Sequence, residues 1–134
     1  MNTQGELSVQ GAIVVVVDDD PAVRNSLKFS LEIEGFVVRV YGSGAELLDA
    51  RDLPICSCLV IDQKMPGMTG LDLIAKLRDR HISAPAILIT SQPNAVLSER
   101  AAKADIPIVE KPLLGNALVD TIRDACARGN SVQG

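Results

Sequence analysis

Short apolar runs alternate with amphipathic segments along most of this 134-residue chain. Runs of valine, isoleucine and leucine bounded by polar residues are typical of strands buried on both faces of a parallel sheet, and apolar residues at helical spacing are typical of helices that cover one. Strands are expected at 12–17, 36–41, 55–61, 85–90 and 106–109, and helices at 21–34, 43–52, from 69 onward, 93–103 and 114–127. The alternation predicts an α/β fold, (βα)5, with a five-stranded parallel sheet between layers of helices.

Capping residues mark three of the predicted helix starts. Asp20 followed by Pro21 is typical of an N-cap and the first helical position. The segments 43–46 (SGAE) and 69–72 (TGLD) have the spacing of a capping box, in which a hydroxyl and a carboxylate satisfy main-chain amides.

Polar residues follow four of the predicted strands. Asp18 and Asp19 directly follow the first strand, and Asp62 follows the third. Thr90 ends the fourth strand, and Lys111 comes just after the fifth. Each residue alone has a simpler interpretation, as a surface acid, a strand-end threonine or a solvated lysine. Because open α/β sheets bind ligands at the carboxyl ends of their strands, the shared position predicts one site.

The residue types indicate the chemistry of this site. The adjacent carboxylates of Asp18, Asp19 and Asp20 repel one another unless a cation or a hydrogen-bond donor neutralises them, and a divalent cation is the leading hypothesis. Asp18, Asp19 and Asp62 offer the hard oxygen ligands that Mg²⁺ prefers. A carboxylate is also a nucleophile toward phosphorus, and Asp62, central in the sheet, is best placed to form an aspartyl phosphate. Lys111 and Thr90 would then bind oxygens of the phosphoryl group.

Composition argues against several classes of function. A formal net charge of -4 opposes binding to nucleic acid or anionic lipid through bulk charge. The chain contains no apolar run of membrane-spanning length and no signal sequence, so a cytoplasmic protein without membrane contact is expected. One domain is expected at 12–128, between a polar N-terminal extension at 1–11 and a polar C-terminal tail at 129–134. These residues contain no helix-turn-helix pattern, and whether they act alone or within a longer protein is left open.

The cysteines and the single histidine receive no chemical role. Cys56, Cys58 and Cys126 lack the spacing of a zinc site and are expected to be buried thiols. His81 is expected at a helix end in contact with solvent.

Four segments carry a resemblance to a known family. The segments VVDDD, VIDQKMPGMTG, ILITS and VEKP resemble, in order and spacing, motifs of the receiver domains of bacterial two-component response regulators. The second segment is most similar to regulators of the nitrogen-fixation and LuxR-type group. The resemblance implies a flavodoxin-like three-layer sandwich with strand order 2-1-3-4-5. It also implies a regulatory domain rather than an enzyme, in which Asp62 accepts a phosphoryl group from a histidine kinase or a histidine phosphotransfer protein.

The resemblance implies a ligand set for Mg²⁺. Asp19, Asp62 and the main-chain carbonyl of Lys64 would bind the ion directly, and Asp18 would act mainly through water. Lys64 and Gln92 occupy positions that govern, in the family, how water reaches the phosphoryl group. The lifetime of the phosphorylated form would depend on these two side chains.

The resemblance also implies how phosphorylation is transmitted. Thr90 and Lys111 would sense the phosphoryl group, and the peptide bond between Lys111 and Pro112 would be cis. Receivers often carry an aromatic residue three positions before the lysine, where this chain has Ile108. The surface formed by the predicted fourth helix, fifth strand and fifth helix would bind a second copy of the chain or an effector.

Two other functions stay open at this point. A phosphatase with an aspartate nucleophile would use the D-x-D pattern at Asp18 and Asp20, although Pro21 and Ala22 do not continue its usual motif. A receiver fold used only for docking would carry out no phosphotransfer. Substitution of Asp62 and labelling by acetyl phosphate distinguish these possibilities.

Overall fold

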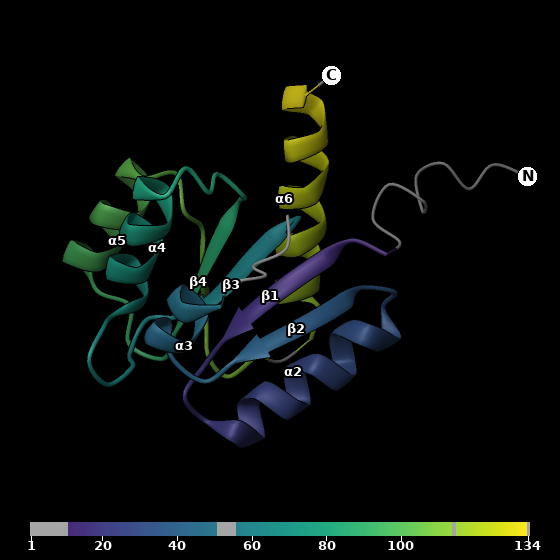
Figure 1. The fold of residues 1–134 in the computed structure, drawn as a ribbon, viewed down its shortest axis with the longest axis horizontal. Helices are drawn as coiled ribbons and strands as arrows, with labels where there is room; N and C mark the ends of the chain where they lie inside the picture. The colour runs from purple at the N-terminus through teal and green to yellow at the C-terminus, as the bar shows by residue number, and fades with distance from the viewer. Residues whose placement is uncertain (1–10, 51–55, 114, 134) are drawn as a thin grey trace, which may run out of the picture.

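The fold is a sheet of parallel strands connected by helices. The computed structural model describes residues 11–50, 56–113 and 115–133, with side chains described up to residue 128. The strands are β1 (Ile13–Val17), β2 (Val37–Tyr41), β3 (Cys58–Asp62), β4 (Ala86–Thr90) and β5 (Ile108–Glu110). The helices are α2 (Pro21–Ile33), α3 (Gly44–Asp49), α4 (Gly70–Asp79), α5 (Ala95–Lys103) and α6 (Ala117–Gln133). Strands and helices alternate along the described chain, as predicted (Figure 1).

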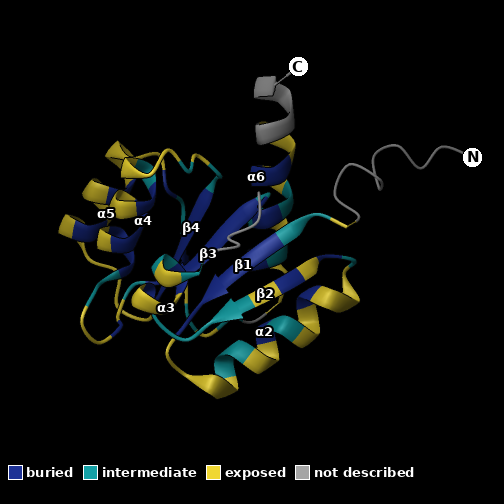
Figure 2. Ribbon diagram, in the orientation of Figure 1, coloured by how far each residue is buried: buried dark blue, intermediate teal, exposed yellow. Residues whose placement is uncertain are grey.

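The sheet has the order β2-β1-β3-β4-β5, with every neighbouring pair parallel. This is the order that the family resemblance implied. Helices α3, α4 and α5 cover one face and α2 and α6 cover the other (Figure 1). The strands between the two layers are mostly buried, and the outer surfaces of the helices are exposed (Figure 2).

The valine run of β1 shows why its sequence does not alternate with polar residues. Val15 and Val17 pack into the core on the side of α3, α4 and α5, whereas Val14 and Val16 pack into the core on the side of α2 and α6. All four side chains are fully buried. Since both faces of the strand are covered, every position must be apolar, and the first polar residue comes where the strand ends.

The starts predicted for the three helices with capping signals are confirmed. The side chain of Asp20 accepts a hydrogen bond from the amide of Ala22, and Pro21 is the first residue of α2. Ser43 accepts from the amide of Glu46 at the start of α3, and Thr69 caps α4 in the same way. Helix α5 begins similarly, at Asn94.

Three helices end in the same arrangement, and only one of them uses glycine. After α2, α4 and α5 the chain passes through one residue with positive φ, namely Gly35, His81 (φ 64°) and Asp105 (φ 59°). The amide of the following residue then bonds back to a carbonyl in the last turn, as in a Schellman motif. These bonds are Phe36 N to Leu31 O, Ile82 N to Leu77 O and Ile106 N to Ala101 O.

The limits of α3 and α6 differ most from those predicted, and α5 begins at Ala95 rather than at residue 93. Helix α3 ends at Asp49 with Ala50 as its C-cap, and residues 51–52 of the predicted segment lie outside the described residues. Helix α6 begins at Ala117 rather than at residue 114, because Gly115 has a φ of +68°, which is incompatible with a right-handed helix. It continues to Gln133, past the predicted end at residue 127. A helix can continue through main-chain hydrogen bonds beyond its apolar face, so the apolar periodicity of the sequence predicted too short a helix.

The cysteines are free and buried, as expected: Cys56, Cys58 and Cys126. Burial raises the pKa of the Cys56 and Cys126 thiols. In the described part of the chain, no helix combines the length and the apolar character needed to cross a membrane.

Candidate functional site

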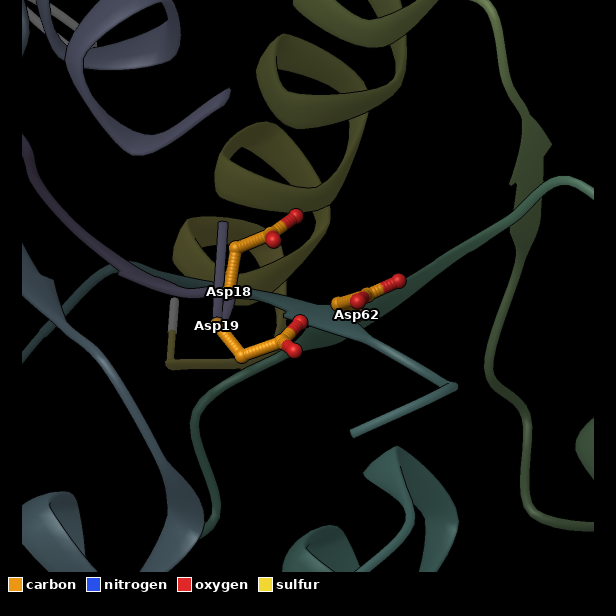
Figure 3. Close-up of side chains that lie close together, drawn as sticks. All are labelled: Asp18, Asp19 and Asp62. Atoms are coloured by element: carbon orange, nitrogen blue, oxygen red, sulfur yellow. The ribbon is translucent and has the colours of Figure 1, made fainter. Parts of the chain in front are cut away.

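Three carboxylates meet at the carboxyl edge of the sheet. Asp18 and Asp19 follow β1, and Asp62 ends the neighbouring strand β3. One carboxylate oxygen from each lies within 4.8 Å of the others (Figure 3). The side chains of Asp18 and Asp62 are buried, whereas Asp19 is exposed to solvent. The acids predicted from the sequence therefore form one cluster, of which Asp19 is the exposed member.

Lys111, which follows the edge strand β5, supplies positive charge to this cluster. Its Nζ lies 3.2 Å from Oδ1 of Asp62 and 3.4 Å from Oδ2 of Asp18. The residue follows β5, which is separated from β3 by β4. The peptide bond between Lys111 and Pro112 is cis, as the family resemblance implied. The lysine thus bridges the two buried acids.

The charges in the cluster shift the pKa of two groups. Burial, followed by the negative charge of Asp18, raises the pKa of Asp62, and Lys111 offsets this only in part. Burial opposes the charged form of Lys111, but the carboxylates of Asp18 and Asp62 outweigh it and raise the pKa of the lysine. The raised pKa of Asp62 reflects burial and like charge around its carboxylate, and a bound cation would relieve this repulsion.

The loop after β1 is held by several hydrogen bonds to Asp18. Oδ1 of Asp18 accepts from the amide of Asp20 at 2.9 Å, and the amide of Asp18 donates to the Tyr41 carbonyl at 3.2 Å. Nη1 of Arg24 donates to the main-chain carbonyl of Asp18 at 2.8 Å. Sequence reasoning assigned no role to Arg24. Its place one turn inside the helix that follows the acids is the signal that could have identified it.

Thr90 lies at the end of β4, between the strands that carry Asp62 and Lys111. It is buried, and its Oγ1 accepts from the amide of Gln92 at 3.2 Å. Its carbonyl accepts from the amide of Lys111 at 2.8 Å. Ile108 is half-buried at the start of β5 and packs against the core under α3, α4 and α5. Thr90 is therefore joined to the lysine through the main chain.

The chain after Asp62 turns closely into α4. Gly70 approaches so closely that a β-carbon there would lie 2.7 Å from the Asp62 carbonyl and 2.7 Å from Cδ1 of Leu88. Oε1 of Gln63 accepts from the amide of Leu71 at 3.0 Å. These contacts fix the main chain at Asp62 against the first turn of α4. Lys64, the next residue along this loop, is exposed.

The acid cluster has the composition of a site for a hard divalent cation. Within the described residues, Asp18, Asp19 and Asp62 are the one group of three potential ligands that lie close enough to hold a metal ion. All three offer carboxylate oxygen and none offers sulfur or imidazole, which favours Mg²⁺ or Ca²⁺ over zinc.

Comparison with known proteins gives consistent results. Residues 14–123 match the family described as response regulator receiver domain. The chain is 35% identical over 118 residues to Nodulation protein W of Bradyrhizobium diazoefficiens, with 87% of this chain and 52% of that protein covered. It is 36% identical over 116 residues to the transcriptional regulatory protein FixJ of Azorhizobium caulinodans, with 86% and 55% covered. The chain therefore spans about half the length of these curated relatives.

Solved structures agree with the sequence comparison. The crystal structure of FixJ-N aligns with a TM-score of 0.78 at 34% identity, covering 89% of this chain and 96% of the other. Full-length FixJ from B. japonicum aligns with a TM-score of 0.78 at 30% identity, covering 90% of this chain and 60% of that one.

Proposed function

Because the chain belongs to the response regulator receiver domain family, we propose that Asp62 accepts a phosphoryl group from a phosphohistidine, with Mg²⁺ held by Asp18, Asp19 and Asp62. Receiver domains are regulatory modules of two-component systems and receive their signal from histidine kinases. One observation carries the proposal: at the carboxyl edge of the sheet, three carboxylates meet one ammonium group. The donor is a histidine kinase or a histidine phosphotransfer protein.

In the proposed reaction, a carboxylate oxygen of Asp62 attacks the phosphorus of the phosphohistidine. The new oxygen–phosphorus bond forms as the phosphorus–nitrogen bond breaks, and the electron pair of that bond stays on the imidazole nitrogen. With a proton on its other ring nitrogen, the donor histidine leaves as neutral imidazole. Asp62 must be ionised to attack, and Lys111 favours this form because its ammonium group lies 3.2 Å away. Lys111 and the hydroxyl of Thr90 then bind phosphoryl oxygens.

The donor set fits Mg²⁺, which takes carboxylate and carbonyl oxygens and usually keeps several waters. When bound, the ion neutralises charge between Asp62 and the incoming phosphoryl oxygens. The main-chain carbonyl of Lys64 is a proposed further ligand. Asp18 is fully buried and already accepts the Asp20 amide, so it fits a role through water better than that of a phosphatase nucleophile.

Two exposed side chains are proposed to set the lifetime of the aspartyl phosphate. Lys64 lies two residues after Asp62 and Gln92 lies two residues after Thr90. In receivers, the side chains at these two positions govern how water reaches the phosphoryl group. Replacing either with alanine should change the half-life of the phosphorylated protein while leaving Mg²⁺ binding unchanged.

The proposed response to phosphorylation passes through Thr90 to the surface of α5, β5 and α6. Helix α5 is attached to the core by only two buried side chains, Leu97 and Ala101, which favours movement between alternative packings. Ile108 is smaller than the aromatic residue common at its position in receivers and is stiff at χ1. The loop before α5 is therefore expected to carry most of the change. A second copy of the chain or an effector would bind this surface.

Incubation with acetyl phosphate and Mg²⁺, followed by mass spectrometry, tests the proposal. The wild-type protein should gain one phosphoryl group, D62N should gain none, and D18N should still be modified on Asp62, more slowly. The exposed acid Asp72, at the start of α4, provides a matched control, because D72N should be modified like the wild type. Modification of D62N but not of D18N would instead support the phosphatase. An unmodified wild-type protein would support a docking scaffold.

A further inference from the structure

Arg24 connects helix α2 to the loop that carries two of the acids. Its guanidinium Nη1 donates to the carbonyl of Asp18 at 2.8 Å, while its own amide donates to the carbonyl of Asp20 at 3.0 Å. The first bond runs from the side of the helix back to the end of β1. It closes the short loop that contains Asp19.

The carbonyl that Arg24 binds belongs to the peptide unit between Asp18 and Asp19. Because a peptide unit is planar, fixing the direction of its carbonyl also fixes where the chain places the α-carbon of Asp19. Among the described residues, no donor bonds to the carboxylate of Asp19, which is exposed. Asp18, in contrast, is held through its amide and its carboxylate. The position of Asp19 therefore depends on the main chain that Arg24 holds.

The space that Arg24 occupies depends on a glycine in another loop. Gly42 lies between β2 and α3, and a β-carbon there would lie 3.2 Å from Nη1 and 3.6 Å from Cζ of Arg24. It would also lie 3.2 Å from Oε1 of Glu46. That carboxylate accepts the Gly42 amide, so the glycine is itself held at the start of α3. Gly42 has no positive φ, so what matters here is the missing side chain rather than backbone freedom.

We propose that Arg24 is a positioning residue for the metal site, which fixes Asp19 through the carbonyl of Asp18 in a space that Gly42 keeps open. The inference rests on the proposed function, because it concerns the same Mg²⁺ site. It adds to the three acids a residue that touches neither the metal nor the phosphoryl group.

The test compares two arginines that both bind main-chain carbonyls. Arg78 donates through Nη1 to the carbonyls of Ile82 at 2.9 Å and Ala84 at 2.8 Å, just before β4 and therefore at the opposite end of the sheet. Mg²⁺ binding to the full chain is measured by titration of amide NMR signals. R24A should weaken Mg²⁺ binding about tenfold, as is typical for loss of a group that orients a ligand. R78A should change it less than twofold.

A second readout uses the protein without metal. R24A should speed hydrogen exchange at the Asp20 amide, which bonds to Asp18, and R78A should not. Both variants lose a side chain that binds main-chain carbonyls, but only R24A loses one at the acid loop. The comparison therefore separates disorder of that loop from a general loss of stability.

A third variant tests the part assigned to Gly42. G42A leaves Arg24 in place but forces its guanidinium to move by a few tenths of an ångström, so Mg²⁺ binding should weaken about threefold. In the R24A background the β-carbon still lies near Oε1 of Glu46 but no longer displaces a group bound to the Asp18 carbonyl, so the same substitution should have no further effect on Mg²⁺ binding. Additive effects of the two substitutions would overturn the role of Gly42.

The outcomes separate this inference from the proposed function. A wild-type protein that binds no Mg²⁺ would overturn both. A wild-type protein that binds Mg²⁺, with R24A binding within twofold of it, would overturn the inference and leave the proposed function standing. Equal losses in R24A and R78A would assign both arginines to stability alone.

Discussion

Asp62, the proposed phosphoryl acceptor, is a buried carboxylate beside a like charge, so we expect D62N to be more stable than the wild type in metal-free solution. The side chain is buried beside the like charge of Asp18, and both features raise its pKa. Asparagine has nearly the same shape and no charge. It removes the repulsion while it keeps the contacts of the side chain with its neighbours.

The size of the effect follows from the distances in the cluster. The acid oxygens lie within 4.8 Å of one another, and at an effective dielectric constant of about 20 two unit charges at that limit repel by about 3.5 kcal/mol. A pair 3.2 Å apart attracts by about 5 kcal/mol. Asp18 and Asp19 both repel Asp62, with Asp19 screened by solvent, and Lys111 attracts it. Lys111 is shared with Asp18, and burial adds a further penalty. We expect a net gain of about 1–2 kcal/mol for D62N at pH 7, or about 2–6 °C in Tm.

The pH dependence has a definite sign. A carboxyl group with a raised pKa in the folded protein stabilises the fold while it is protonated, and this contribution is lost as the pH rises through the folded pKa. The advantage of D62N should therefore be absent below the unfolded-state pKa of about 3.9 and grow as the pH rises above it. Urea denaturation followed by circular dichroism across this range measures it, and the slope m should stay unchanged.

If the proposed function holds, Mg²⁺ should reverse the order of stability. A concentration of 100 Kd would stabilise the wild type by about 2.7 kcal/mol, and D62N, which lacks one proposed ligand, should gain much less. Replacing the exposed acid Asp124 with asparagine is the matched control and should change stability by less than about 0.5 kcal/mol. A D62N protein that is less stable than the wild type without metal, or that gains as much from Mg²⁺, would refute the electrostatic argument.

Three further substitutions have expected effects on unfolding free energy, each measured by urea denaturation. Gly70→Ala should destabilise the protein by about 1–3 kcal/mol, because its β-carbon would lie 2.7 Å from the Asp62 carbonyl and from Leu88; a neutral result would mean that this turn relaxes freely. Asp105→Gly should stabilise by about 0.5–1 kcal/mol by relieving a positive φ, and a loss would show that the aspartate side chain contributes there. Lys111→Met should destabilise the protein by about 3 kcal/mol at pH 7, since two buried carboxylates lose their cation. This loss of stability should shrink in acid as Asp62 becomes protonated, and a loss of equal size at acidic pH would contradict the explanation.

The parts of the fold that sequence predicted are those that burial imposes. Because helices cover both faces of the sheet, every position of β1 must be apolar. The strand and its end before Asp18 could therefore be predicted from the valine run alone. Parallel strands then bring Asp18 and Asp62 to one edge whatever the details of packing. The order of the strands, in contrast, came from family resemblance, since apolar periodicity does not specify which strands are neighbours.

The parts that sequence missed depend on distances between loops. The bond from Arg24 to the Asp18 carbonyl requires knowing that a side chain in α2 turns back over the preceding loop. The contact between Gly42 and Arg24 could not be predicted without knowing that β2 pairs with β1. His81 and Asp105 adopt positive φ without being glycine, so residue type alone gave no signal of how α4 and α5 end.

The buried cysteines make the chain suitable for selective chemical labelling. Thiol reagents react with the thiolate, and burial both hides Cys56 and Cys126 and raises the pKa of their thiols. Cys58 is fully inaccessible within β3. A cysteine introduced at an exposed position such as Val96 of α5 should therefore react with a maleimide well before the native thiols do. A single spectroscopic probe can then test the proposed movement of α5 without replacing any native cysteine.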